Sequence, residues 1–123
     1  MRISPAILPA LKAGTHVPPP PLPIQVPNYD REDLKAGIVH VGMGNFHRGH
    51  MAVYMDDLFD KGEGLDFGIV GASLYSQRRR DALEPQGWLQ CLVQRDGESA
   101  QCRVLGSMMD YLPVDPENGH PEL

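Results

Sequence analysis

The residues best placed to do chemistry stand in one short stretch, GIVHVGMGNFHRGH, at positions 37–50. An apolar run at 38–41 ends at Gly42, and Gly44 follows two positions later. A turn that holds the pyrophosphate of a dinucleotide needs a first glycine for the sharp exit from a strand and a second so that main chain can approach the anion. A helix that begins directly afterwards directs its unpaired N–H groups at the same anion. The stretch has both glycines in the required order.

The turn and the start of the expected helix supply the candidate dinucleotide-binding residues. These are Gly42, Met43, Gly44, Asn45, Phe46, His47 and Arg48. Arg48 would either reach a phosphate oxygen or remain a solvated surface charge. The strict GxGxxG fingerprint fails, because His47 stands at its third glycine position. On the residues alone, a phosphate-binding turn and a simple tight corner therefore both stay open.

The histidines beside this turn raise the question of a metal site. His47 and His50 lie three positions apart and would share one face of a helix. No third ligand stands nearby, and the HExxH and paired-cysteine patterns of zinc sites are missing. Cys91 and Cys102 also lack zinc-site spacing. We predict no metal, two histidines that are polar or packing residues of the helix start, and two reduced thiols.

The elements around the turn are predicted to form a βαβ unit. Residues 38–41 indicate a buried strand, and residues 46–61, which contain no proline, indicate a helix that Gly62 ends in a left-handed conformation. The apolar stretch 65–75 indicates a second buried strand. Two strands joined by a helical crossover run parallel. The predicted fold class is therefore α/β with a parallel sheet.

Residues 88–106 predict an antiparallel hairpin added to this unit. The dipeptide Asp96-Gly97 favours a two-residue type I′ turn, in which both positions have positive φ. This turn fixes the register and places the apolar side chains of both strands on one face. The predicted opposing pairs are Val93 and Ala100, Cys91 and Cys102, and Leu89 and Val104.

Residues 1–29 are predicted to be a proline-rich arm, and residues 30–123 to be the domain that follows it. Each proline fixes φ and removes a backbone donor, so we expect neither a regular helix nor a central strand in the arm. The run PPPPLP at 18–23 favours polyproline II. It would serve either as an extended arm laid over a neighbouring domain or as a ligand for an SH3-type module.

Composition and charge narrow the classes of function. With 123 residues, 41% hydrophobic and 22% charged, the chain has the make-up of one small soluble domain. A net charge of −5 argues against a nucleic-acid partner. No apolar run reaches the ~18 residues of a transmembrane helix, and the N-terminus lacks the apolar region of a secretory signal. We therefore expect no membrane partner and a cytoplasmic location.

The segment VPNYDREDLKAGIVHVGMGNFHRGHMAVYMDDLF, at 26–59, resembles the opening of the mannitol dehydrogenase family. These long-chain polyol dehydrogenases include fructuronate reductases and arabinitol dehydrogenases, and their glycine motif reads GxGxFHRAH. Here Gly49 replaces the usual alanine, while the histidine at position 47 is normal for the family. The segments DALEPQGWLQCLVQRDG and RVLGSMMDYL extend the similarity to about residue 115.

The resemblance implies a Rossmann-type domain that binds NAD or NADP, followed in the family by a largely helical domain. The family transfers hydride between nicotinamide and a sugar alcohol, a ketose or a sugar acid. Its catalytic lysine lies in the later part of those proteins, so we assign no catalytic residue here and expect the substrate to bind only with the C-terminal domain. By this resemblance the chain is a fragment of the Rossmann domain without turnover of its own.

Two further points stay open at this stage. The segment LYSQRRR carries no acid where an NAD site places one, and Arg78, Arg79 and Arg80 would either accept a 2′-phosphate or form a solvated helix face. The alternative function is a non-catalytic remnant or interaction module that acts through the proline-rich arm or an exposed sheet edge. Such an edge would cause poor solubility or oligomerisation, whereas a monodisperse monomer would count against it.

Overall fold

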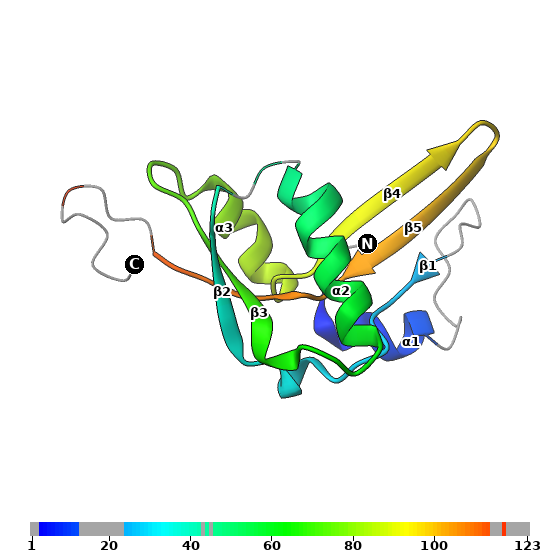
Figure 1. Cartoon of the computed structure of the whole chain (residues 1–123). Helices are drawn as coiled ribbons and strands as arrows, with labels where there is room; N and C mark the ends of the chain where they lie inside the picture. The colour runs from blue at the N-terminus through cyan, green and yellow to red at the C-terminus, as the bar shows by residue number, and fades with distance from the viewer. Residues whose placement is uncertain (1–2, 13–23, 43, 45, 114–116, 118–123) are drawn as a thin grey trace.

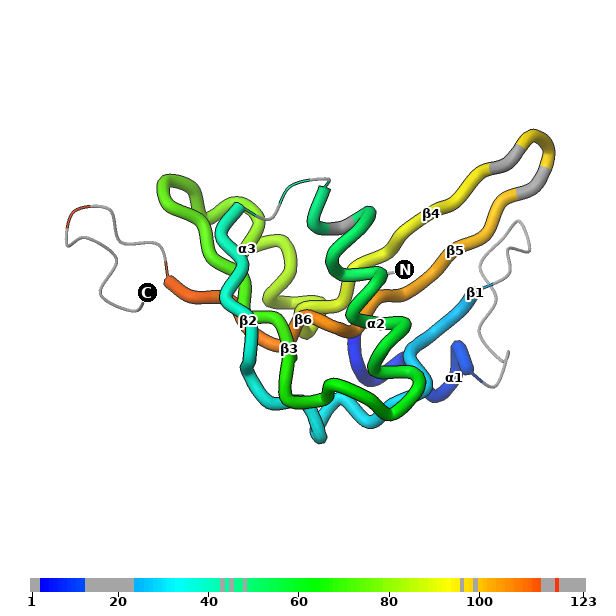
Figure 2. The backbone as a smooth tube through the Cα atoms, in the orientation of Figure 1, coloured from blue at the N-terminus to red at the C-terminus, as the bar shows by residue number. Residues whose placement is uncertain are grey.

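The structure, a computed structural model, describes residues 3–12, 24–42, 44, 46–113 and 117. The described residues form two three-stranded sheets besides their helices and turns (Figure 1; β6 is labelled in Figure 2). The first sheet has the order β2-β3-β6, from β2 (Ala36–Val41), β3 (Gly68–Ala72) and β6 (Met108–Tyr111). The second has the order β1-β5-β4, from β1 (Ile24–Gln25), β4 (Gln90–Asp96) and β5 (Ser99–Leu105). The predicted α/β class is confirmed.

The predicted βαβ unit forms the parallel sheet. β2 and β3 pair in parallel, with Val39 opposite Val70 and Val41 opposite Ala72. The helix between them starts as a π-helical turn, His47–Met51, and continues as α2 (Ala52–Asp60). The predicted stop is confirmed, since Gly62 has a φ of +74° and its N–H donates to the Phe59 carbonyl at 2.9 Å. The connection thus carries the chain from the carboxyl end of β2 back to the start of β3.

A third parallel strand, β6, was not expected from the sequence. It pairs with β3 on the side away from β2, with Val70 opposite Asp110 and Gly71 opposite Tyr111. β6 follows β5 after only Gly106 and Ser107, and Asp110 interrupts its apolar pattern. β2 lies at the other edge of this sheet, and no strand of the described residues pairs with its outer side.

The hairpin is present, but its predicted register is wrong by two residues. Val93 lies opposite Cys102, Cys91 lies opposite Val104, and the two-residue turn is Gly97-Glu98. The positive φ of +58° falls on Gly97, the first turn position, as a type II′ turn requires. The predicted pairs Val93 with Ala100, Cys91 with Cys102, and Leu89 with Val104 are therefore corrected. A shift of two keeps the same side chains on the same face.

The hairpin extends away from the rest of the molecule (Figure 2). Its base is buried, with Leu89 and Val104 at most 1% exposed, whereas Val93 further out is half exposed. Both cysteines are free thiols, with Cys91 exposed and Cys102 partly buried.

The N-terminal residues contain a short helix, which corrects the expectation that none would form there. A 3₁₀ turn, Pro5–Ile7, leads into α1 (Leu8–Lys12). Both Pro5 and Pro9 stand in the first turn of their element, where a missing N–H removes no helical hydrogen bond. Leu11 of α1 and Val26 are buried against Leu89 and Val104, and β1 pairs with the edge of β5. The run 18–23 lies outside the described residues, and the division at residue 29 stays a prediction.

The remaining elements are short. Three 3₁₀ turns span Arg31–Asp33, Leu65–Phe67 and Glu84–Gln86. A one-and-a-half-turn helix, α3 (Arg78–Leu83), follows β3. Arg31 links the segment before β2 to the turn before β4, to the β5–β6 connection and to β6, because its guanidinium donates to the carbonyls of Gly87, Gly106 and Met108.

Candidate nucleotide-binding site

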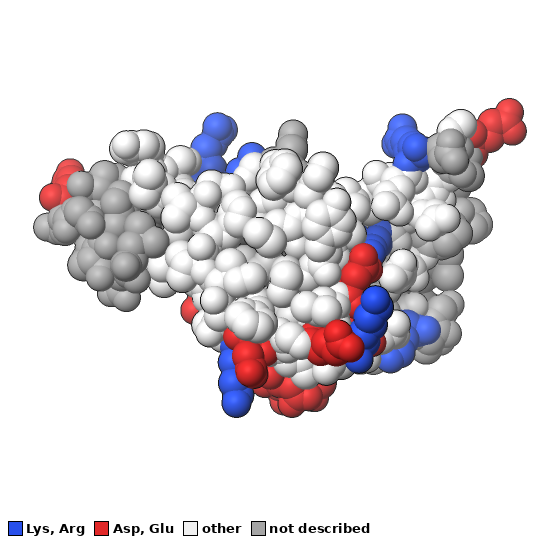
Figure 3. Space-filling model, viewed as in Figure 1, with Lys and Arg blue, Asp and Glu red and all other residues white. Residues whose placement is uncertain are grey.

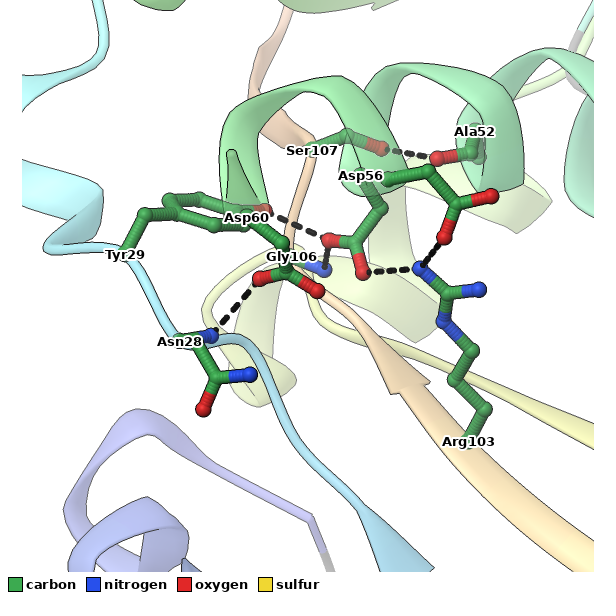
Figure 4. A network of polar contacts seen from close by, with 9 residues as sticks. Asn28, Tyr29, Ala52, Asp56, Asp60, Arg103, Gly106 and Ser107 are labelled. Atoms are coloured by element: carbon green, nitrogen blue, oxygen red, sulfur yellow. Dashed lines mark hydrogen bonds and ion pairs between the residues drawn. The ribbon is translucent and has the colours of Figure 1, made fainter. Parts of the chain in front are cut away.

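A buried polar network holds α2 in place, and with it the π-helical turn that precedes α2 (Figure 4). Asp56 is 1% exposed, and its Oδ1 accepts from the Tyr29 hydroxyl at 2.6 Å and from the Gly106 N–H at 3.0 Å. Its Oδ2 accepts from Arg103 Nη2 at 2.9 Å. Burial, followed by the neighbouring Asp56 carboxylate, raises the pKa of Tyr29 far above its usual range, so this hydroxyl stays protonated. The helix is therefore tied to β5, to the β5–β6 connection and to the segment before β2.

The glycine corner closes tightly after β2. Gly42 has a φ of +90°, a conformation that L side chains rarely adopt, and its N–H donates to the Ala72 carbonyl at 2.9 Å. The Gly44 N–H donates back to the Gly42 carbonyl at 2.9 Å. The corner is thus fastened to the end of β3. Met43 and Asn45 lie outside the described residues.

The main chain of this corner is open to a ligand. A Cβ built on Gly42 or Gly44 would meet no atom of the described residues within 4 Å. A Cβ at Gly44 would touch no described neighbour, so crowding within the described part does not explain its glycine. The free space is what the approach of a pyrophosphate to bare backbone requires.

The side chains at the helix start divide into a buried and an exposed set. The His47 ring is fully buried and packs on the His40 ring, with 4.5 Å between centroids. Phe46 is 70% exposed and stacks on His50 at 4.8 Å, and the Tyr54 ring follows at 6.4 Å from His50. The structure therefore brings Gly42, Gly44, Phe46 and His47 to one corner, where His47 is buried as a whole residue and packs inside the helix start.

Arg48 belongs to the π-helical turn, and its side chain is outside the described part. This wide turn is defined by the bond from the Ala52 N–H to the His47 carbonyl, five residues earlier. The first N–H groups of a helix have no partner within it, and those of this turn follow directly after the glycine corner. Among the described residues, no three metal-ligating side chains gather into a cluster.

Two adjoining hollows lie at the carboxyl ends of β2 and β3. The first, of about 320 Å³, is lined by Val41, Gly42, Ser73, Leu74, Tyr75 and Ser76. The second, of about 390 Å³, is lined by Ser73, Ser76, Arg78, Arg79 and Ala82. Ser73 and Ser76 line both hollows, so the hollow at the glycine corner and the hollow at the arginines lie on either side of the same residues. The arginines were singled out from the sequence, but Ser73 and Ser76 were missed, because the predicted second strand, 65–75, extended past its actual end at Ala72.

A larger hollow, of about 820 Å³, lies elsewhere, between α1, residues 26–34 and Trp88. It includes Leu34, which precedes β2, and so lies toward the amino end of that strand. Ligands of open α/β sheets bind outside the carboxyl ends of the strands. The two smaller hollows beside Gly42 are therefore the candidate site.

The face of the molecule over β2, β3 and α2 is largely uncharged (Figure 3). The area over β2, β3 and α2 in this view is mostly free of Lys, Arg, Asp and Glu, and acidic residues gather along its lower border. Val39 and Val41 of β2 are 57% and 47% exposed, so the prediction of a buried strand at 38–41 is wrong, because β2 is the edge strand of the described sheet. No helix among the described residues is long and apolar enough to cross a membrane.

A parallel βαβ unit with a glycine corner after its first strand, and a hollow over the carboxyl ends, is the architecture of a Rossmann-type nucleotide-binding domain. Residues 36–119 match the family model described as the mannitol dehydrogenase Rossmann domain. The chain therefore belongs to the mannitol dehydrogenase family, and the resemblance noted from the sequence is confirmed.

Individual relatives agree with this assignment. The chain is 47% identical over 94 residues to the mannitol 2-dehydrogenase of Cereibacter sphaeroides, a match that covers 75% of this chain and 20% of that protein. It is 43% identical over 91 residues to that of Pyrenophora tritici-repentis, covering 72% and 16%. The chain thus spans about a fifth of the length of these curated relatives.

Solved structures are similar in fold as well. A ternary complex of Pseudomonas fluorescens mannitol 2-dehydrogenase with NAD and D-mannitol matches with a TM-score of 0.76 and 37% identity, covering 91% of this chain and 22% of that one. A substrate-free D-sorbitol dehydrogenase matches with a TM-score of 0.75 and 29% identity, covering 96% and 23%. The partial Rossmann-type fold predicted from the sequence is confirmed.

Proposed function

We propose that this chain is the dinucleotide-binding part of an NAD(P)-dependent oxidoreductase that acts on a sugar alcohol, a ketose or a sugar acid. The observation that carries the proposal is the unobstructed main chain at Gly42 and Gly44, at the carboxyl end of β2 and next to a hollow. The family membership and the NAD-containing neighbour support the same ligand class. When bound, nicotinamide supplies hydride transfer.

Each residue of the corner has a defined part in this proposal. Gly42 supplies the positive φ that turns the chain out of β2, and Gly44 leaves room for the pyrophosphate. The N–H groups of Met43, Asn45 and Phe46 bind the pyrophosphate oxygens. Arg48 is the charge partner of a phosphate oxygen.

Dehydrogenase turnover is proposed to depend on residues that this sequence does not supply. The chain spans about a fifth of its curated relatives, and we assign none of its residues to proton or hydride transfer. Recognition of the polyol, ketose or sugar acid belongs to the same missing part. The testable activity of the chain itself is therefore cofactor binding.

The experiment is a calorimetric titration of the chain with NAD⁺ and NADP⁺, repeated with Gly44→Val. Because a Cβ at position 44 meets no atom of the described residues within 4 Å, the variant should fold normally yet occupy the space of the pyrophosphate, and binding of both cofactors should be lost. Gly49→Ala is the matched control, since its Cβ also meets nothing within 4 Å but lies further along the helix. If Gly44→Val keeps its affinity for the cofactors, the pyrophosphate does not bind at the glycine corner.

A second candidate is a non-catalytic module that associates through its sheet edge. The observation that favours it is β2, which lies at an edge and exposes Val39 and Val41. Unpaired edges of this kind favour association with another chain. Light scattering of the purified chain, together with the cofactor titration, distinguishes the two candidate functions. Oligomers that bind neither cofactor support the non-catalytic module, whereas a monodisperse monomer that binds a cofactor excludes it.

A further inference from the structure

The end of β3 bears on which nicotinamide dinucleotide the chain binds, a question that rests on the proposed function. A dinucleotide whose pyrophosphate lies at Gly42 and Gly44 places its adenosine ribose beside the residues that follow the second strand. NAD sites place an Asp or Glu there, whose carboxylate accepts from the ribose 2′-hydroxyl. In this chain residues 73–77 read Ser-Leu-Tyr-Ser-Gln, so that carboxylate is missing.

The hollow at this place is lined by cationic and hydroxyl side chains. Arg78 and Arg79 line it together with Ser73 and Ser76, and no acidic residue is among the lining residues. The first acidic residue after β3 is Asp81, on α3, and it does not line the hollow. A carboxylate here would repel a phosphate, whereas guanidinium groups pair with one.

The three consecutive arginines have different surroundings. Arg80 is engaged by the fold, because its Nη1 lies 3.3 Å from Glu84 Oε2 and its Nε donates to the Tyr111 carbonyl at 3.3 Å. Arg78 and Arg79 are exposed and make no ion pair with any described residue. The solvated-face alternative therefore does not apply to Arg80, and the two arginines that face the hollow remain able to bind an anion.

The backbone around the hollow is held in place by the fold. The Ser73 hydroxyl pairs with the hydroxyl of Tyr111, which is 1% exposed in β6. Ser76 Oγ accepts from the Arg78 N–H at 3.2 Å and so fixes the turn into α3. A site held by such contacts needs little rearrangement when an anion arrives.

We propose that Arg78 and Arg79, with Ser73 and Ser76, bind the 2′-phosphate of NADP, and that the chain prefers NADP to NAD. The phosphate gains charge-assisted hydrogen bonds from two guanidinium groups. The 2′-hydroxyl of NAD finds no carboxylate acceptor at the same place.

The test is a calorimetric titration of the chain with NADP⁺, NAD⁺ and the pair 2′,5′-ADP and 5′-AMP, which differ only by the 2′-phosphate. NADP⁺ should bind at least about tenfold more tightly than NAD⁺, and the affinity for 2′,5′-ADP should exceed the affinity for 5′-AMP by a similar factor. Arg78→Gln and Arg79→Gln should each weaken NADP⁺ about tenfold and leave NAD⁺ unchanged. Arg95→Gln, an equal change of charge at an exposed position of the hairpin, is the control and should alter neither.

The outcomes separate the two proposals. Equal affinities, or tighter binding of NAD⁺, would overturn the preference for NADP and leave the proposed function standing. If neither dinucleotide binds to the folded chain, as checked by circular dichroism, the proposed function fails as well. NADP⁺ binding that the two arginine variants leave unchanged would overturn the assignment of these residues.

Discussion

The carboxylate of Asp56 should contribute far more to stability than that of its neighbour Asp57. In Asp56→Asn, the amide oxygen can still accept from the Tyr29 hydroxyl and the Gly106 N–H. The amide nitrogen then faces Arg103 Nη2, so two donors meet where an ion pair of 2.9 Å stood. The change preserves the shape of the side chain and removes its charge.

The expected loss follows from the burial of this pair. Asp56 is 1% and Arg103 is 10% exposed at the side chain, and breaking a buried ion pair costs about 3–5 kcal/mol. Arg103 retains Asp57 Oδ1 at 2.6 Å, which puts the expected loss near the lower limit, at about 3 kcal/mol. Asp57→Asn makes the same chemical change on a side chain that is 52% exposed, and should cost less than about 1 kcal/mol.

Urea unfolding followed by the fluorescence of Trp88, the single tryptophan, measures both changes. A loss of about 3 kcal/mol lowers the midpoint by about 1–3 M urea at an ordinary slope of about 1–3 kcal/mol per M, and the slope itself should not change. Equal midpoints for the two variants, or a larger shift for Asp57→Asn, would refute the reasoning from burial.

Three further predictions concern stability. The pKa of Tyr29 is raised from its ordinary value of 10.0, so the unfolded chain releases this proton before the folded chain does as the pH rises. The free energy of unfolding should therefore fall above about pH 10, by up to about 1.4 kcal/mol per pH unit. Tyr29→Phe should lack this contribution to the pH dependence, as measured by urea unfolding at alkaline pH. Gly37→Ala should destabilise by about 3 kcal/mol, because its Cβ would collide with the Asp66 carbonyl oxygen and stand 2.7 Å from Phe67 Cα, while Gly44→Ala should leave the urea midpoint unchanged. Leu89→Ala, at a fully buried position, should cost about 2–5 kcal/mol in thermal or urea unfolding, and Val93→Ala, at a half-exposed one, should cost much less.

The parts of the fold that depend on local chemistry could be predicted from the sequence. The glycine corner, the helix after it and its stop at Gly62 are set by residues within a few positions of each other. The hairpin was found for the same reason. Its register was missed because one glycine at positive φ suits both turn types, and the choice between Asp96-Gly97 and Gly97-Glu98 depends on how the strands pack.

The parts that depend on distant contacts could not be predicted. Asp56 joins residues 27 and 50 positions away, and an acidic pair on a helix gives no sign of such partners. α1 escaped notice because prolines at first-turn positions resemble helix breakers until the start of the helix is known. At the site, Ser73 and Ser76 gained meaning only when β3 was seen to end at Ala72, which places them over the sheet.

The strand order also bears on how much of a cofactor this chain can hold. Rossmann sheets consist of two mononucleotide-binding halves in the order 3-2-1-4-5-6, and β6-β3-β2 corresponds to the run 3-2-1. The described part therefore contains only the half of the nucleotide-binding cleft that contacts the adenylate, and no described residue lies where the nicotinamide ring would bind. Removal of the nicotinamide ring alone, with both phosphates kept, should therefore change the affinity of the dinucleotide for the chain little.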